Sequence, residues 1–174
     1  MVAHVRKYGI YILLLSLSFC LGPSQASAQQ GYELKGGYVS TDNGTGWVAG
    51  AGLVVSHTNT TETIFALERY ITTDTEDITG VSRETQVTAW PITLTNKVFY
   101  PGTRFYYGTG LGVYFSTTKI LEDSIEVASV SETNIGYHLL AGFQLSAGTR
   151  LEGKYFQGGS DAGNGFTLTL NKMF

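Results

Sequence analysis

Apolar and polar residues alternate with a period of two along most of the chain, a pattern that predicts β-strands. After the first 28 residues, no long stretch repeats apolar residues at helical spacing. Eight segments carry the alternation: 31–40, 47–57, 63–71, 87–100, 104–118, 134–145, 150–156 and 165–174. We therefore expect an all-β protein.

Two of these segments depart from simple alternation. In residues 63–71, Arg69 occupies a position on the otherwise apolar face, so the pattern does not fix the limits of this strand. Residues 87–100 contain Pro91, which has no N–H group to donate to a neighbouring strand. We expect Pro91 to lie near a strand end or a bulge.

The two faces of the predicted strands differ in an unusual way. One face carries nearly all of the large aromatic and aliphatic residues, whereas the other is mostly glycine with a few charged residues. Glycine weakens a strand that faces water, but inside a narrow barrel it leaves room for neighbouring side chains. We interpret the apolar face as outward and the glycine-rich face as lining a lumen. Balanced charges on that inner face predict a network of structural ion pairs, formed by Glu33, Lys35, Glu68, Lys97, Glu152 and Lys154.

The connections between the segments alternate in length. Those after the even-numbered segments are the short sequences TNTT, PGT and SAGT. Those after the odd-numbered segments are longer: TDNGTG, TTDTEDITGVSRE, KILEDSIEVASVSE and QGGSDAGNG. Short turns on one side, longer loops on the other and an even number of strands are typical of outer-membrane barrels. The sequence thus predicts an eight-stranded antiparallel up-and-down transmembrane β-barrel.

The first 28 residues have the features of a secretory signal peptide. A basic start precedes an apolar run of about 15 residues, shorter than the roughly 20 that a membrane-spanning helix needs. Ala26-Ser27-Ala28 then matches a cleavage site, so we expect cleavage after Ala28 and a single barrel domain over residues 29–174. The chain's one cysteine, Cys20, leaves with the signal, so no disulfide can hold the mature fold.

Charge and histidine content exclude several kinds of function. Loss of Arg6 and Lys7 with the signal leaves nine basic residues against fourteen acidic ones, a net charge of −5. An acidic chain without a basic cluster is a poor candidate for binding nucleic acid. His57 and His138 stand alone, which is too few ligands for a typical metal site. Because no nucleophile, base and orienting group fall into a recognisable arrangement, we expect no metal, no cofactor and no enzymatic activity.

The segment ITLTNKVFYPGTRFYYGTGLGVYFS resembles the central hairpin of the small eight-stranded outer-membrane barrels, a family that includes the OmpA membrane domain, OmpX and OmpW-like porin-family proteins. The glycine pattern of that hairpin begins at Tyr106 and continues as Gly108, Gly110 and Gly112. The resemblance covers essentially the whole mature chain. It implies that the terminal Phe174 is a signal read by the outer-membrane assembly machinery. Lys172 departs from the family, in which an aromatic or apolar residue is commoner at that position.

The resemblance and the connection lengths together lead to a functional expectation. We expect a monomeric, non-enzymatic protein of the bacterial outer membrane that contacts outer-membrane lipid and lipopolysaccharide. Its structural or surface-interaction role would be carried by the outer loops, about residues 71–86 and 118–133, toward an extracellular partner that the sequence does not identify. Three alternatives stay open: a narrow pore or carrier for small solutes, a lipid-modifying barrel enzyme, and a soluble lipocalin-like binder.

Overall fold

The computed structural model describes residues 31–78, 81–158 and 164–174, in which every regular element is a β-strand. The strands are β1 (Gly31–Thr41), β2 (Gly44–His57), β3 (Thr61–Ile78), β4 (Val81–Phe99), β5 (Phe105–Glu122), β6 (Ile125–Ser146), β7 (Thr149–Gln157) and β8 (Asn164–Met173). Within these residues, no helix has the length and apolar character needed to cross a membrane. The expected signal peptide, with its cleavage site at Ala28, lies outside the described residues.

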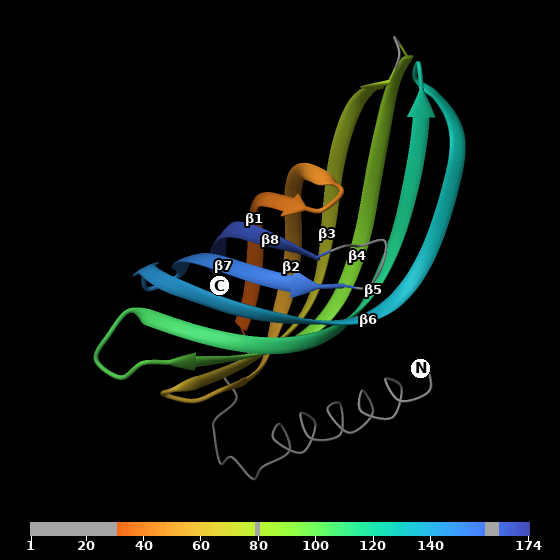
Figure 1. Cartoon of the computed structure of the whole chain (residues 1–174). Helices are drawn as coiled ribbons and strands as arrows, with labels where there is room; N and C mark the ends of the chain where they lie inside the picture. Colours follow the sequence, from red (N-terminus) through yellow and green to blue (C-terminus); the bar gives the residue numbers. More distant parts are fainter. Residues whose placement is uncertain (1–30, 79–80, 159–163) are drawn as a thin grey trace.

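The eight strands form a closed antiparallel barrel in sequence order (Figure 1). Each strand pairs with the next one, and β8 pairs back onto β1 over the stretch from Glu33↔Met173 to Thr41↔Gly165. Backbone hydrogen bonds between Tyr32 and Phe174, with N···O distances of 2.9 and 3.2 Å, carry this closure to the last residue. The predicted fold class is confirmed.

Short turns join the strands at one end of the barrel, which we call the turn end. Residues 58–60 connect β2 to β3, residues 100–104 connect β4 to β5, and residues 147–148 connect β6 to β7. In the second of these, Gly102 has φ +74°, a left-handed conformation that glycine adopts without steric cost. These are the three connections that the sequence predicts to be short.

The prediction of long loops at the opposite end is wrong for residues 72–84 and 119–132, which are mostly strand. β3 and β4 stay paired as far as Ile78↔Val81, and β5 and β6 stay paired as far as Glu122↔Ile125. Polar side chains occupy both faces of these strand ends, so the alternation that marks a half-buried strand is absent there.

Two of the hairpins at this end have tight turns. Asp123 and Ser124 alone connect β5 to β6, and both have positive φ values of 48° and 69°, as two-residue hairpin turns require. The predicted loop TDNGTG also reduces to a turn, because β1 reaches Thr41 and β2 begins at Gly44.

Four strands rise well beyond the rest of the barrel wall (Figure 1). β2 pairs with β3 only up to Thr45↔Thr73, and β7 pairs with β6 only from Tyr137↔Gln157, so their neighbours continue without them. We call this four-stranded sheet the extension. It consists of residues 74–78 of β3, 81–86 of β4, 117–122 of β5 and 125–134 of β6.

Pro91 lies in the middle of β4 and not near a strand end or bulge, contrary to the sequence-based expectation. The register between β3 and β4 is the same on both sides of it, with Leu67↔Ile92 and Tyr70↔Ala89, and no residues are paired in between. Proline has no N–H group, so the ladder is interrupted locally while the strand continues.

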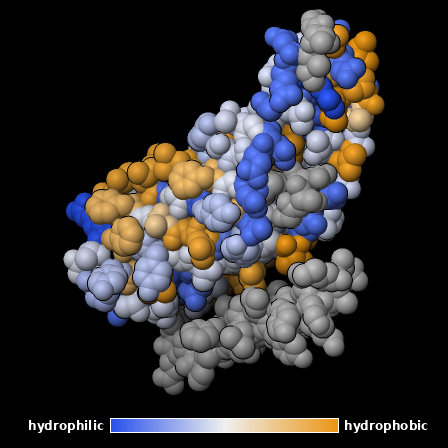
Figure 2. Space-filling model, viewed as in Figure 1, coloured by the Kyte–Doolittle hydropathy of each residue, from blue (hydrophilic) through white to orange (hydrophobic). Residues whose placement is uncertain are grey.

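The predicted outward face is the face that the structure exposes. Large apolar side chains such as Tyr32, Leu67 and Leu170 are exposed, and residues of this kind occur on all eight strands. In the view of Figure 2, apolar side chains gather over the barrel wall, whereas hydrophilic ones cover much of the extension. An apolar belt around a polar interior is the arrangement of a barrel that lies in lipid.

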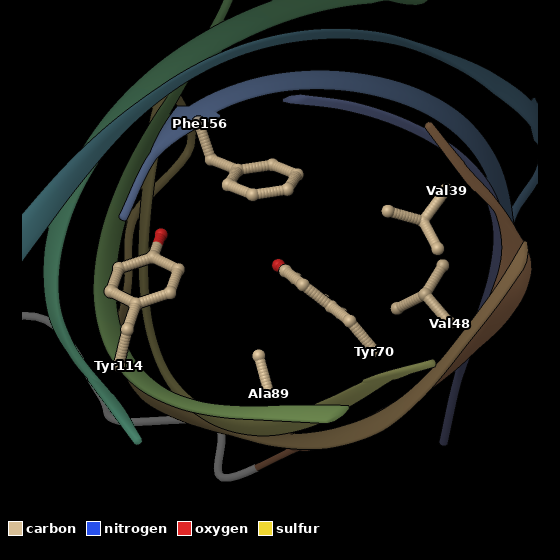
Figure 3. Packing of buried hydrophobic residues seen from close by; sticks show 6 residues of the cluster. All are labelled: Val39, Val48, Tyr70, Ala89, Tyr114 and Phe156. Atoms are coloured by element: carbon tan, nitrogen blue, oxygen red, sulfur yellow. The ribbon is translucent and has the colours of Figure 1, made fainter. Parts of the chain in front are cut away.

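The interior near the base of the extension is filled by aromatic and aliphatic side chains. Tyr70, Tyr114 and Phe156 point toward one another across the barrel, with Val39, Val48 and Ala89 around them (Figure 3). The ring centroids of Tyr70 and Phe156 lie 5.0 Å apart, and those of Tyr114 and Phe156 lie 6.2 Å apart. This aromatic cluster occupies the interior of the barrel at the extension end.

Candidate functional site

The six charged residues named from the sequence all lie on the inner wall, between the aromatic cluster and the turn end. Their side chains are at most 6% exposed. They come from β1, β3, β4 and β7, which the register places around the ring: Glu33, Lys35, Glu68, Lys97, Glu152 and Lys154.

These residues form one connected network of ion pairs. Lys35 Nζ lies 2.9 Å from Glu68 Oε1 and 3.2 Å from Glu33 Oε1. Lys97 Nζ lies 3.0 Å from Glu33 Oε2 and 2.7 Å from Glu152 Oε2. Each of these two lysines therefore joins two carboxylates that stand on different strands.

Lys154 completes the network, and two tyrosines support it. Lys154 Nζ donates to Glu68 Oε2 at 2.5 Å, and the Tyr70 hydroxyl donates to the same oxygen at 2.5 Å. The Tyr106 hydroxyl donates to Glu152 Oε2 at 3.2 Å. Hydrogen bonds of this kind satisfy carboxylate oxygens that would otherwise be buried at a large cost in free energy.

The sequence analysis missed a further ion pair in the same interior. Arg150 binds Glu62 in a bidentate manner, with Nη1 2.6 Å from Oε1 and Nη2 3.0 Å from Oε2, and its Nη1 lies 3.9 Å from Glu33. The alternation of side chains along a strand could have predicted both residues. Glu62 lies an even number of positions from Glu68, and Arg150 lies two positions from Glu152, so each shares the inward face of its strand. Both missed residues stand at strand starts, where the face assignment had not been applied.

His138 is buried on the inner wall, where its Nε2 lies 2.9 Å from the Thr95 hydroxyl oxygen. His57 lies near the turn end, and its Nδ1 is 3.4 Å from Glu62 Oε2. The described part of the chain contains no group of three or more metal-ligating side chains. Among the described residues, neither imidazole contacts both a nucleophile and an orienting carboxylate, as the histidine of a catalytic triad does.

The extension presents two strand edges without neighbours. On β6, residues 125–135 precede the first pair with β7, so their outer side has no partner strand among the described residues. Ile125, Val127, Val130 and Ile135 are all more than half exposed along this stretch. The edge of β3 is shorter and carries the acidic residues of 74–77.

Phe174 is exposed and lies at the turn end, next to Tyr32 on β1. The side chain of Lys172 also faces outward and is exposed. Proximity to the barrel rim lets a lysine reach toward the lipid–water interface.

Comparisons with known proteins give matches in fold only. No protein-family model and no curated protein matches the chain. A solved structure of Ail, the attachment invasion locus protein of Yersinia pestis, in complex with the heparin analogue sucrose octasulfate is similar with a TM-score of 0.56 at 13% identity, over 83% of this chain and 99% of that one. The N-terminal β-barrel domain of Pseudomonas aeruginosa OprF is similar with a TM-score of 0.53 at 11% identity, over 83% of this chain and 97% of that one. The chain thus has the fold of the small outer-membrane barrels.

Proposed function

We propose that the chain is a non-enzymatic protein of the bacterial outer membrane that binds a partner outside the cell through its extension. The apolar belt on all eight strands supports a place in a bilayer, and the fold shared with outer-membrane barrels supports the outer membrane. The expected signal peptide would supply the export. In this orientation the turn end faces the periplasm and the extension stands outside the cell.

The unpaired edge of β6 carries the proposal. An exposed strand edge presents a row of free N–H and C=O groups, to which an extended segment of another protein can add as a further strand. Residues 125–135 are rich in β-branched side chains, which favour the extended conformation. The right-hand margin of the extension, where β6 runs, is correspondingly apolar in Figure 2.

The β3 edge is less suited to pairing with an added strand. Asp74, Glu76 and Asp77 lie along it and are exposed. Charges on an edge strand discourage pairing with other strands. The difference between the two edges gives the extension one preferred side for binding.

A peptide-display selection on outer-membrane vesicles tests this function. Vesicles carrying the wild-type protein are used for selection, and vesicles carrying a variant without residues 117–131 are used for counter-selection. The deletion leaves Ser116 facing Glu132, a pair already present in the register, so an Asn-Gly turn can join them. We expect selected peptides with alternating β-branched residues that bind the wild type and lose binding to this variant.

The matched control removes residues 75–84 and joins Asp74 to Thr85, which are also paired, through an Asn-Gly turn. It deletes Glu76 and Asp77 from the acidic edge but keeps residues 125–135. Peptides that bind both shortened variants equally, or a wild type that enriches no peptides, would contradict a role for the β6 edge. Cell fractionation tests the location separately, since recovery of the protein in the soluble periplasm would rule out an outer-membrane function.

A further inference from the structure

The cationic side chain of Arg69 lies on the outer wall of the barrel, among apolar residues. Arg69 belongs to β3, and its neighbours on the outward face of that strand are Leu67 and Ile71. A charged side chain on the lipid-facing side is destabilising at the bilayer midplane and much less so near the interface. The position of Arg69 therefore calls for a physical account.

Two tryptophans flank the guanidinium group. Arg69 Cζ lies 5.8 Å from the ring centroid of Trp47 on β2 and 5.0 Å from that of Trp90 on β4. Both distances suit cation–π attraction, which holds the guanidinium in a fixed place on the barrel wall. Trp47 and Trp90 are also the only two tryptophans in the chain.

Arg69 has no anionic partner among the described residues. No carboxylate of that part of the chain forms an ion pair with it, and its Nε is buried without a hydrogen-bond acceptor. By contrast, the ammonium and guanidinium groups that the described part of the chain places on the inner wall all have carboxylate partners. Arginine donates through a planar fork that matches two oxygens of a phosphate, so this group is prepared to bind an anion.

The position of Arg69 between the turn end and the extension indicates what kind of anion it can bind. Toward the turn end the outward residues are apolar, including Phe65, Leu67 and Ile92. Toward the extension the outward rows are rich in hydroxyl and amide groups: Thr73, Gln86, Thr88, Thr117 and Ser131. Arg69 thus stands at the boundary between an apolar belt and a polar wall, where tryptophan is also enriched in membrane proteins.

We infer that Arg69, held by Trp47 and Trp90, binds a phosphate group of a phosphorylated glycolipid in the outer leaflet. Acyl chains would lie against the apolar rows, the phosphate would accept hydrogen bonds from Arg69, and sugar hydroxyls would meet the polar rows above. A simple phospholipid offers the phosphate but no sugar for that wall. This inference rests on the proposed outer-membrane location.

Tryptophan emission tests the inference directly, because both tryptophans belong to the site. Purified full-length protein in detergent micelles is titrated with lipid A, the phosphorylated disaccharide lipid, and the emission is recorded. We expect a saturable change for the wild type. Arg69→Leu should raise the lipid A concentration at the midpoint about tenfold or more, because it removes charge-assisted hydrogen bonds to the phosphate. The midpoint of Arg69→Lys should fall between those of the wild type and Arg69→Leu.

The control variant is Lys119→Leu. Lys119 also lies on the outward face but higher on the extension, and its Nζ is paired with Glu126 at 2.7 Å. We expect this variant to respond as the wild type does. Heat-modifiable mobility on gels shows whether each variant is folded. If Arg69→Leu fails to fold, the Arg69→Lys variant and the lipid comparisons on the wild type still test whether Arg69 binds the phosphate.

The lipid comparisons identify the source of the phosphate. Lipid A stripped of its phosphates, phosphatidylglycerol and inorganic phosphate should each bind about tenfold more weakly than lipid A, or not at all. An equal response to phosphate-free lipid A would overturn the phosphate contact, and an equal response to phosphatidylglycerol or inorganic phosphate would overturn the glycolipid. Because the titration is done in micelles, its failure is distinguishable from failure of the proposed location, which fractionation measures.

Discussion

Glu68 is a junction of the interior network, because three donors share its carboxylate. Its two carboxylate oxygens accept from Lys35, Lys154 and the Tyr70 hydroxyl, and the side chain is 1% exposed. A buried charge is tolerated when it is paired and hydrogen-bonded, whereas removal of one partner leaves the others uncompensated. The network therefore constrains which substitutions the interior accepts.

Replacing Glu68 with glutamine should destabilise the barrel by about 3–5 kcal/mol, because two buried ammonium groups lose their shared anion. Urea unfolding of the protein in lipid vesicles, followed by tryptophan emission, measures this change. Glu76→Gln is the matched control: Glu76 is exposed on the extension, and its substitution should change the stability by less than about 0.5 kcal/mol. Equal effects of the two variants would show that the network does not stabilise the fold.

Gly142 shows why glycine lines the inner wall. A Cβ atom at this position would overlap the phenol ring of Tyr106, which fills the space across the strand. At Gly36, on the outer wall, the nearest atom to an added Cβ is the Val48 carbonyl oxygen at 3.9 Å. The two glycines therefore differ in the room that each one leaves.

Gly142→Ala should lower the free energy of unfolding by about 1–3 kcal/mol, because the Tyr106 ring must move away from the new methyl group. Gly36→Ala should be neutral or stabilising by roughly 0.5–1 kcal/mol, since alanine costs less conformational entropy than glycine. The same urea experiment compares the two variants. A Gly142→Ala variant as stable as Gly36→Ala would mean that the interior can accommodate a methyl group beside the Tyr106 ring.

At the scale of elements, β8 has to close the ring against β1. Phe174, directly after β8, pairs with Tyr32 through two backbone hydrogen bonds, and its aromatic side chain is exposed at the turn end. We propose that the assembly machinery recognises this strand end during insertion.

Phe174→Asn should reduce the amount of folded protein in the outer membrane, because a polar residue replaces the aromatic group at the strand end. The amount is measured by fractionation and heat-modifiable gel mobility. Tyr100→Asn is the control, since Tyr100 is a comparably exposed aromatic residue in a turn at the same end. Normal assembly of the Phe174 variant would mean that the chain simply ends in a strand.

The extension is the part of the sheet that the sequence predicted least well. Strands were predicted up to Ile71 on β3 and from Val87 on β4, which is where one face stops being buried. Beyond that point the threonine, aspartate and glutamate residues show no period-two pattern, although neighbouring strands still pair them. Backbone pairing is set by the adjacent strand, so composition alone could not reveal it.

Removal of residues 117–131 should leave the barrel folded, since the interior network and the aromatic cluster lie below the extension. Heat-modifiable mobility and the urea midpoint measure this, and we expect both to stay close to those of the wild type. Complete loss of the folded band would show that the extension is needed for the barrel itself.

At the scale of the whole molecule, two successive layers of side chains occupy the interior of the barrel. Ion pairs cross it between the turn end and Glu68, and the rings of Tyr70, Tyr114 and Phe156 fill it beyond that point. Eight strands give a barrel that side chains can fill, so both layers can span it completely. The pore alternative receives no support from this arrangement.

The purified wild-type protein should therefore show no steady large conductance in planar lipid bilayers. Brief openings would be compatible with exchange of ion-pair partners, because the layers are held by side chains. A constant open current across the whole population would contradict a closed lumen and would favour transport as the function.

Within the eight alternating segments, the sequence by itself determined which way the residues face. A strand turns successive side chains to opposite sides, so one correct face assignment fixes all the others along that strand. That rule was sufficient for the six inward charges and for the outward apolar belt, whereas the closed barrel of eight strands was predicted from the connection lengths and the even number of strands. It also placed Arg69 on the apolar side before any neighbour was known.

Only the tertiary structure decided which residues meet. Arg150 and Glu62 are 88 positions apart, and the two tryptophans around Arg69 come from two different strands. Such contacts depend on the stagger of the strands around the closed ring, which periodicity within one strand cannot specify. The unequal strand lengths that create the extension arise in the same way, because each strand continues for as long as a neighbour pairs with it.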